Sequence, residues 1–313
     1  MKTTSWAVIL LFLIALIPSC KKDNDSGTPP GGHDTTFTPF KKLADFVPAN
    51  HSVAGMDYHA PTKNLYFYIS KSTVKGYSIM QLNTETKQAL IVFTFNDGQW
   101  SNTNGSEGKR IRIFGNELYV MGGATNEHFH RLTGIGNNTL TLAKVIKMPI
   151  SSSPHWGESY DVAVADRLYV MTMRDKITYG SKTDLSSPGS FTLAFTTHGA
   201  SVLYASKDGN GYLLSKGGND GKIEVRNPVN GNFLRAVTIE SDNSTTLAKD
   251  SKDRVYIIDN NNVLRYSPDL LTKEEFAIKD ANTNYQFAIA EESNFVRIYQ
   301  NSSGEIKTAK VPM

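Results

Sequence analysis

The sequence predicts an all-β domain of six similar four-stranded antiparallel sheets, and three observations support this fold class. Short stretches that alternate apolar and polar residues follow one another from residue 37 to the end of the 313-residue chain. Gly, Asn and Asp separate these stretches, as expected for strands joined by tight turns. One such unit recurs six times, and no long amphipathic helical pattern interrupts it.

The first 19 residues have the pattern of an export signal. Lys2 supplies a positive charge, Trp6 to Pro18 form an apolar run, and Ser19 precedes the only cysteine, Cys20. The run is too short to span a bilayer, which needs roughly 20 residues. The segment resembles a bacterial lipoprotein signal peptide, and this resemblance implies that Cys20 is the lipidated first residue of the mature chain. The alternative is an ordinary secretory signal with an incidental cysteine.

Residues 20–36 are expected to form a flexible tether between the lipid and the folded domain. Lys21 to Asp25 are mostly charged, and the following stretch is rich in Gly and Pro without apolar periodicity. Such a composition buries too little apolar surface to offset the entropy of ordering. The charged residues after the cysteine resemble export signals of surface lipoproteins of Gram-negative bacteria. We therefore expect an outer-membrane lipoprotein at the cell envelope, with its domain facing outward.

The recurring unit centres on an aliphatic residue followed by tyrosine. Its equivalent positions are Tyr66, Tyr119, Tyr169, Tyr212, Tyr256 and Arg297, which lie 53, 50, 43, 44 and 41 residues apart. This period is typical of a propeller blade. Residues 37–313 are therefore expected to form a six-bladed β-propeller of four-stranded antiparallel blades. We expect the repeated tyrosines to pack between the sheets.

The fourth and sixth copies predict individual strands. In the fourth, the strands are expected at 201–206, 212–215, 222–226 and 233–239. The sixth supplies only three, at 287–291, 295–299 and 306–311, before the chain stops. Residues 40–47 look like an outer strand without a blade, so we expect them to complete the sixth blade and close the ring. Closure also removes the sheet edges that invite aggregation.

Two short motifs resemble known propeller groups. Met121-Gly122-Gly123 resembles the double glycine of kelch blades, and residues 225–231 resemble the turn before the outer strand of NHL-like blades. These resemblances imply a fold and do not point to a particular function.

The charge balance argues against a nucleic-acid partner. Without Lys2 the chain has 32 basic and 30 acidic residues, dispersed along the sequence, whereas a polyanion requires a concentrated basic face. No phosphate-binding loop, dinucleotide fingerprint or Gly-x-Ser-x-Gly elbow is present. We expect no cofactor and a monomeric domain, attached to the membrane through the lipid on Cys20.

The loops that join an outer strand to the next inner strand gather at one opening of a propeller, here called the mouth, together with the loops between second and third strands. Function usually collects in such loops. The repeat assigns eight candidate ligand-binding residues to the mouth: Trp100, Glu107, Arg110, His155, Trp156, Glu158, His198 and Tyr285. The aromatic residues could stack on a sugar or peptide while the polar ones fix its orientation. Alternatively, the two tryptophans only anchor long loops.

Catalysis is the competing hypothesis. His51, His155 and His198, together with Glu107, Glu158 or Asp242, could hold a metal with an open position, as in the lactonase-like propellers that this set resembles. Glu107 and Glu158 could instead act as a carboxylate pair across the channel. His128 and His130 alternate on a predicted strand and could ligate a metal, although a strand edge with two polar residues is the favoured explanation.

The sequence therefore favours a non-catalytic surface lipoprotein that binds a glycan, a peptide or a partner protein through the mouth. A metal-assisted or carboxylate-based hydrolase or lyase is the first alternative, and a structural component of an envelope complex is the second.

Overall fold

The computed structural model describes most of the chain after the predicted tether. The described residues are 32–71, 77–95, 110–121, 128–147, 162–164, 167–173, 176–186, 188–192, 202–205, 213–217, 222–227, 230, 232–239, 246–282 and 286–313. From His33 to Met313 they belong to one unit. In this described part, the secondary structure consists of 24 strands and two 3-10 helices, η1 (Leu43–Asp45) and η2 (Ala60–Thr62).

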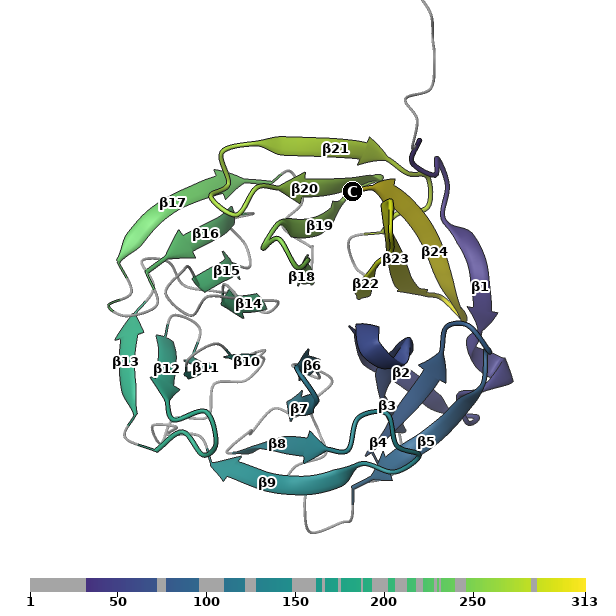
Figure 1. Ribbon diagram of the computed structural model, residues 1–313, viewed down its shortest axis with the longest axis horizontal. Coiled ribbons are helices and arrows are strands. Elements are labelled where there is room, and N and C mark those ends of the chain that lie inside the picture. Colours follow the sequence, from purple (N-terminus) through teal and green to yellow (C-terminus); the bar gives the residue numbers. More distant parts are fainter. Residues whose placement is uncertain are drawn as a thin grey trace, which may run out of the picture. The chain divides into compact units, whose positions relative to one another are not determined.

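The strands form six four-stranded antiparallel sheets, numbered here as blades from the inner to the outer strand (Figure 1). Blade 1 contains β2 (His51–His59), β3 (Asn64–Lys71), β4 (Tyr77–Asn83) and β5 (Ala89–Thr94). Blade 2 contains β6 (Arg110–Phe114), β7 (Glu117–Met121), β8 (His128–Thr133) and β9 (Thr141–Lys147). Blade 3 contains β10 (Val162–Val164), β11 (Leu168–Met173), β12 (Lys176–Gly180) and β13 (Gly189–Thr192).

The second half of the chain repeats the arrangement. Blade 4 contains β14 (Val202–Ala205), β15 (Leu213–Gly217), β16 (Lys222–Arg226) and β17 (Phe233–Thr238). Blade 5 contains β18 (Leu247–Lys249), β19 (Val255–Asp259), β20 (Asn262–Tyr266) and β21 (Lys273–Ala277). Blade 6 contains β22 (Phe287–Glu291), β23 (Phe295–Ser302) and β24 (Glu305–Pro312), with β1 (Thr38–Lys42) as its outer strand.

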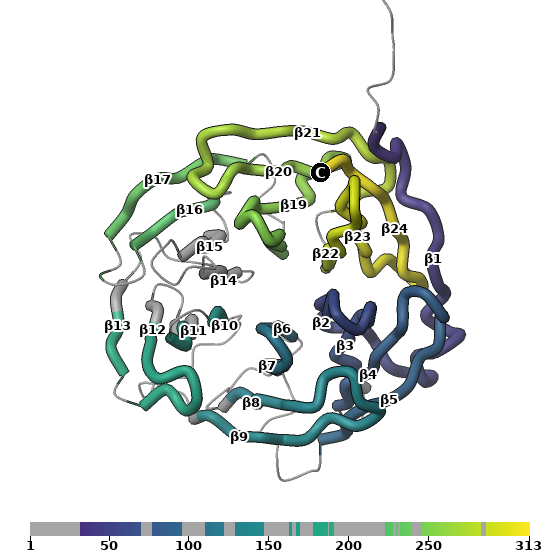
Figure 2. The backbone as a smooth tube through the Cα atoms, viewed as in Figure 1, coloured from purple at the N-terminus to yellow at the C-terminus, as the bar shows by residue number. Residues whose placement is uncertain are grey.

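The six blades close into a ring. Each inner strand contacts the inner strands of both neighbouring blades, including β22 of the last blade with β2 of the first. The tube in Figure 2 shows the inner strands around a common centre and the outer strands along the rim. The all-β fold, its propeller arrangement and its small antiparallel blades are therefore confirmed. The strands predicted at 222–226 and 287–291 match β16 and β22, and β14, β15 and β17 differ from prediction by one or two residues at their ends.

The chain closes the ring with an N-terminal strand, as predicted, but of the predicted residues 40–47 only 40–42 belong to it. The structure pairs Thr38 with Thr308 and Lys42 with Glu305, so the strand ends before Leu43. Residues 43–45 form the helix η1, and Phe46 and Val47 donate their N–H groups to the Leu43 carbonyl. Leu43, Phe46 and Val47 all pack against one core cluster. Their spacing of three and four residues suits a helical turn, whereas a strand would have pointed neighbours to opposite faces.

Residues that precede β1 contact both blade 6 and blade 5. Asp34 donates its N–H to the Lys310 carbonyl at 2.9 Å, and its carboxylate accepts the Lys310 N–H. Thr36 forms an isolated parallel bridge with Lys279 of blade 5, and Phe37 is buried between blades 5 and 6. The N-terminal segment therefore joins blade 5 to blade 6 before it completes blade 6.

The core lies between neighbouring sheets rather than at the centre of the ring. Apolar clusters occupy the junctions between blades, and four of the repeated tyrosines, Tyr66, Tyr119, Tyr169 and Tyr256, are almost fully buried in the part that the structure describes. This is the packing expected from the repeat. Among the described residues, no helix is long and apolar enough to cross a bilayer.

Candidate functional site

Most of the predicted mouth lies outside the described residues. This holds for Cys20, Asp242 and seven of the eight candidate ligand-binding residues: Trp100, Glu107, His155, Trp156, Glu158, His198 and Tyr285. The eighth, Arg110, is the first residue of β6 at the mouth end of blade 2, and it is only 8% exposed. The role of these residues in ligand binding stays a prediction.

The histidines considered as metal ligands are partly described. His51 begins β2, and its Nδ1 lies 3.1 Å from the Ala49 carbonyl oxygen. The His130 ring is buried and packs edge-on against Phe95, with the ring centroids 4.9 Å apart. Within the described ranges, no group of three His, Cys, Asp or Glu side chains could hold a metal ion.

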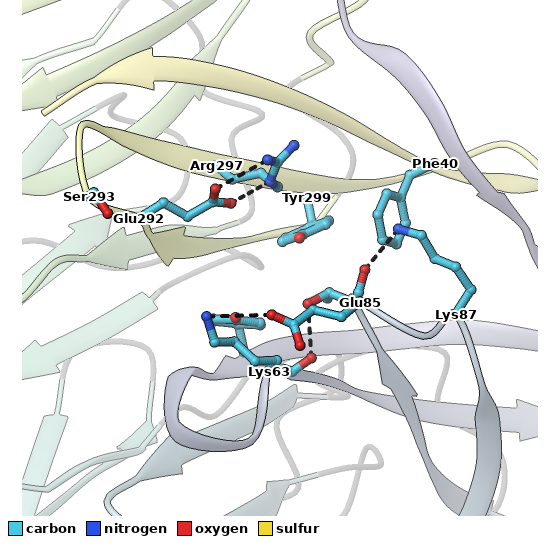
Figure 3. Close-up of a pocket in the computed structure, with 10 residues that line it drawn as sticks. Phe40, Lys63, Glu85, Lys87, Glu292, Ser293, Arg297 and Tyr299 are labelled. Carbon is cyan, nitrogen blue, oxygen red and sulfur yellow. Dashed lines mark hydrogen bonds and ion pairs between the residues drawn. The ribbon is translucent and has the colours of Figure 1, made fainter.

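A pocket of about 490 Å³ lies where blade 6 meets blade 1 (Figure 3). We call it the junction pocket, and it is lined by ten residues: Phe40, Tyr58, Lys63, Thr84, Glu85, Lys87, Glu292, Ser293, Arg297 and Tyr299. Its volume falls within the usual range of small-molecule sites, roughly 300–1,000 Å³.

The junction pocket opens on the side of the ring opposite the predicted mouth. Lys63 lies between first and second strands of blade 1, and Glu292 and Ser293 lie at the same place in blade 6. Thr84 to Lys87 form the turn between third and fourth strands of blade 1. In a four-stranded antiparallel blade, these turns lie at the strand ends away from the loops that form the mouth. The sequence prediction, which considered only the mouth, therefore missed this site.

Three aromatic rings from three strands form the floor of the junction pocket. Tyr299 of β23 is only 3% exposed, and the Tyr58 ring of β2 stacks on it at 6.0 Å with an interplanar angle of 29°. Phe40 of the closing strand β1 meets Tyr299 edge-on at 5.0 Å. These rings belong to the apolar cluster between blades 6 and 1, so the core beneath the pocket holds them in place.

Ion pairs line the walls above this floor. Arg297 donates from Nε to Oε1 of Glu292 at 2.5 Å and from Nη2 to Oε2 at 3.3 Å, a two-pronged contact that fixes both groups. Although burial opposes its charge, this carboxylate raises the pKa of Arg297. Lys63 lies 3.8 Å from Glu85 on the more exposed wall. Arginine and lysine thus each face a carboxylate.

Lys87 is placed differently from the other two cations. Its ammonium donates to the Thr84 carbonyl at 2.9 Å and lies over the Phe40 ring, 3.0 Å from the centroid. Burial, together with the positive charges of Arg297 and Lys41, lowers the pKa of Lys87. Its backbone is left-handed, with φ of +62°, a conformation that residues other than glycine rarely adopt.

The tyrosines of the floor stay protonated at neutral pH. Burial raises the pKa of Tyr299 to about 12, against the weaker effect of a hydrogen bond with the Thr84 side chain. Burial also raises the pKa of Tyr58, which has the same threonine as a neighbour. Two neutral hydroxyls that can donate or accept hydrogen bonds therefore lie beside the paired charges.

The sequence carried one signal for this pocket. Arg297 occupies the repeat position that is tyrosine in the other five copies. Where it is described, the pairing between the inner and the second strand of each blade confirms that these positions are equivalent. The pairs are Tyr66 with Asp57, Tyr119 with Arg112, Tyr256 with Ala248 and Arg297 with Ala290. In blades 2 and 5 the tyrosine hydroxyl meets a carboxylate, Glu117 and Asp250. In blade 6 an Arg297–Glu292 pair takes that place, so the departure from the repeat marks the site.

Comparison with known proteins supports the fold but identifies no function. No family model matches the chain, and no curated protein matches its sequence. Among solved structures, a catalytically inactive virginiamycin B lyase from Staphylococcus aureus, crystallised with quinupristin, is 14% identical with a TM-score of 0.55 over 88% of this chain and 99% of its own.

Other propellers are about as similar. The WD40 propeller domain of Doa1 is 11% identical with a TM-score of 0.51 over 82% of this chain and 77% of its own, and a luciferin-regenerating enzyme is 11% identical with a TM-score of 0.50 over 87% and 94%. The TM-scores show that this chain shares the β-propeller fold with enzymes and with a WD40 domain, and at such low identities the similarity shows the fold alone. The fold alone therefore does not decide between binding and catalysis.

Proposed function

We propose that this chain is a non-catalytic binding module and that it holds its ligand in the junction pocket between blades 6 and 1. One observation carries the proposal: an aromatic floor that packs on the core is surrounded by charged groups that are already held by neighbours. Preorganised groups of this kind bind a ligand without first having to be ordered, which favours affinity.

Of the three ligand classes expected from the sequence, the pocket best supports a glycan. Rings such as Phe40 and Tyr58 offer apolar faces to a sugar, while Glu292 and Arg297 provide fixed acceptors and donors for hydroxyl groups. A peptide or a partner protein is the other possible occupant, and the experiment below distinguishes them.

The first test is a glycan array probed with the purified full chain, followed by calorimetric titration of the sugars that bind. Ser293 is exposed at the rim, so Ser293→Trp should obstruct the pocket with little effect on folding. We expect this variant to weaken binding at least about tenfold. Lys182→Trp, in an exposed turn of blade 3, is the matched control and should bind like the unmodified chain.

Three results would contradict the proposal in different ways. Equal binding by both tryptophan variants would place the ligand elsewhere, with the predicted mouth as the next candidate. Binding of peptides but of no glycan would replace the ligand class. Conversion of a bound sugar to product during the titration would favour the hydrolase or lyase alternative.

We also propose that lipid on Cys20 anchors this module to the outer membrane and that the domain faces outward. The lysine, apolar run and small residue before Cys20, followed by the Gly- and Pro-rich stretch, support this location. Cys20→Ala should move the chain from the membrane fraction to the soluble fraction of cells. Protease treatment of intact cells should remove the domain, and its survival there would contradict the outward orientation.

A further inference from the structure

The contact between Lys87 and Phe40 indicates the charge of the ligand that the junction pocket would bind. The Lys87 ammonium covers the Phe40 ring at 3.0 Å from the centroid (Figure 3). A cation over an aromatic face is held by the ring electrons, but more weakly than by a carboxylate at hydrogen-bond distance. An anionic ligand could therefore draw the ammonium toward itself.

The walls define which anion fits. Arg297 and Lys63 already face Glu292 and Glu85, and Lys87 makes its contacts with a backbone carbonyl and a ring. The lining residues comprise three cations and two carboxylates, a net charge of one positive. One negative charge balances the pocket, whereas a dianion such as a phosphate monoester would leave an excess negative charge beside the two glutamates.

Movement of Lys87 toward an anion would uncover an aromatic surface. The Phe40 face that the ammonium now covers would become free to contact an apolar surface of the same ligand. A ligand with a carboxylate next to an apolar face would use both groups at once. Sugars with a carboxylate on the ring have this combination, because their axial C–H groups form such a face.

We propose that the ligand of the junction pocket is an acidic saccharide whose single carboxylate is bound by Lys87 while its ring lies on Phe40. This inference rests on the proposed function, since it names the sugar class taken by the same site. Burial, and after it the charges of Arg297 and Lys41, lower the pKa of Lys87, and a carboxylate of the ligand would offset these effects.

The test uses two saccharides that differ only in the acidic group: an oligosaccharide that contains one glucuronic acid residue, and the same oligosaccharide with that carboxylate reduced to a hydroxymethyl group. Calorimetric titration of the full chain should show at least about tenfold tighter binding of the acidic form. Lys87→Gln should remove this preference, so that the acidic and the neutral form bind this variant equally. Lys252→Gln, at an exposed lysine of the blade 5 turn, is the control and should keep the preference.

Each outcome separates this inference from the proposed function. Equal binding of the two saccharides, abolished by Ser293→Trp, would overturn the acidic preference and leave the binding module intact. Binding of neither, with glycan-array signals also absent, would overturn both. A sulfated form of the neutral oligosaccharide serves as a third ligand, and tighter binding of it than of the carboxylate would overturn the choice of anion.

Discussion

The junctions on either side of blade 1 are built from the same repeat but end differently. Between blades 1 and 2, Tyr66 is fully buried, and its hydroxyl accepts the Gly136 N–H at 3.1 Å. The turn that carries Gly136 lies against blade 1, where the Leu140 N–H donates to the Val92 carbonyl at 2.7 Å. This junction is filled by protein.

Between blades 6 and 1, the equivalent position is Arg297, whose side chain is 21% exposed, and its partner Glu292 is 32% exposed. A neutral ring can be buried against a backbone amide, whereas a guanidinium and a carboxylate keep more of their hydration. The same position in one repeat thus closes one junction and leaves a pocket at the other. The predictions below either break or sharpen this contrast.

The largest expected effect is at the filled junction. Tyr66→Ala should lower the free energy of unfolding by about 3–5 kcal/mol, because it removes a buried ring and leaves a cavity. Arg297→Ala should cost only about 1 kcal/mol, since the ion pair that it breaks is partly solvated. Urea denaturation of both variants measures the difference, and equal losses would mean that the two junctions do not differ as described.

The next effect concerns the floor of the pocket at high pH. Folding raises the pKa of Tyr299 from 10 to about 12, so the folded protein holds this proton more tightly than the unfolded chain. The stability contributed by protonation is complete below pH 10 and is lost as the pH rises through about 12, a change of about 3 kcal/mol.

Tyr299→Phe should therefore flatten the fall in stability between pH 10 and 12, measured by urea denaturation at a series of pH values. Tyr256, whose pKa burial also raises to about 12, lies at the junction between blades 5 and 6 and provides the comparison. Tyr256→Phe should flatten the profile by a similar amount. An unchanged profile for Tyr299→Phe would contradict the burial of its hydroxyl.

Restoring the repeat at the open junction is the next test. Arg297→Tyr should place a ring where the other five copies have one, and its hydroxyl could meet Glu292 as Tyr256 meets Asp250. We expect ligand affinity to fall at least about tenfold while the free energy of unfolding changes by less than about 1 kcal/mol. Calorimetric titration and urea denaturation of the same variant measure both. Unaltered binding would show that the size of the side chain at this position does not set the pocket.

These contrasts also show what the sequence could predict. The spacing of the aliphatic-tyrosine pairs is local and periodic, so it predicted six sheets and, in the fourth and sixth copies, the positions of the strands to within three residues at their ends. The closing strand was predicted in the right place but extended too far: residues 40–42 belong to it, whereas Leu43, Phe46 and Val47 follow a helical spacing that was taken for a strand. Ring closure itself followed from counting strands in the last copy.

The pocket could not be predicted in the same way. Phe40, Tyr58 and Tyr299 are separated by up to 259 residues, and only closure of the ring brings the two ends of the chain together. Each residue is ordinary in its own strand. The exception was Arg297, visible as a break in the tyrosine repeat, and its meaning depends on Glu292 and on the turn of blade 1 that lies opposite.

The smallest effect separates backbone strain from the contact with Phe40. Lys63 and Lys87 both have left-handed backbones, with φ of +57° and +62°, which glycine adopts without the steric cost of a side chain. Lys63→Gly should raise the free energy of unfolding by about 0.5–1 kcal/mol, since its exposed pair with Glu85 contributes little. Lys87→Gly should gain the same amount but lose the ammonium's contacts with the Phe40 ring and the Thr84 carbonyl, which together are worth about as much, so its net effect should be near zero. The difference between the two variants in urea denaturation measures these ammonium contacts in the unliganded protein. An equal gain at both positions would mean that the ammonium does not rest on the ring, and it would remove the basis for a ligand that displaces it.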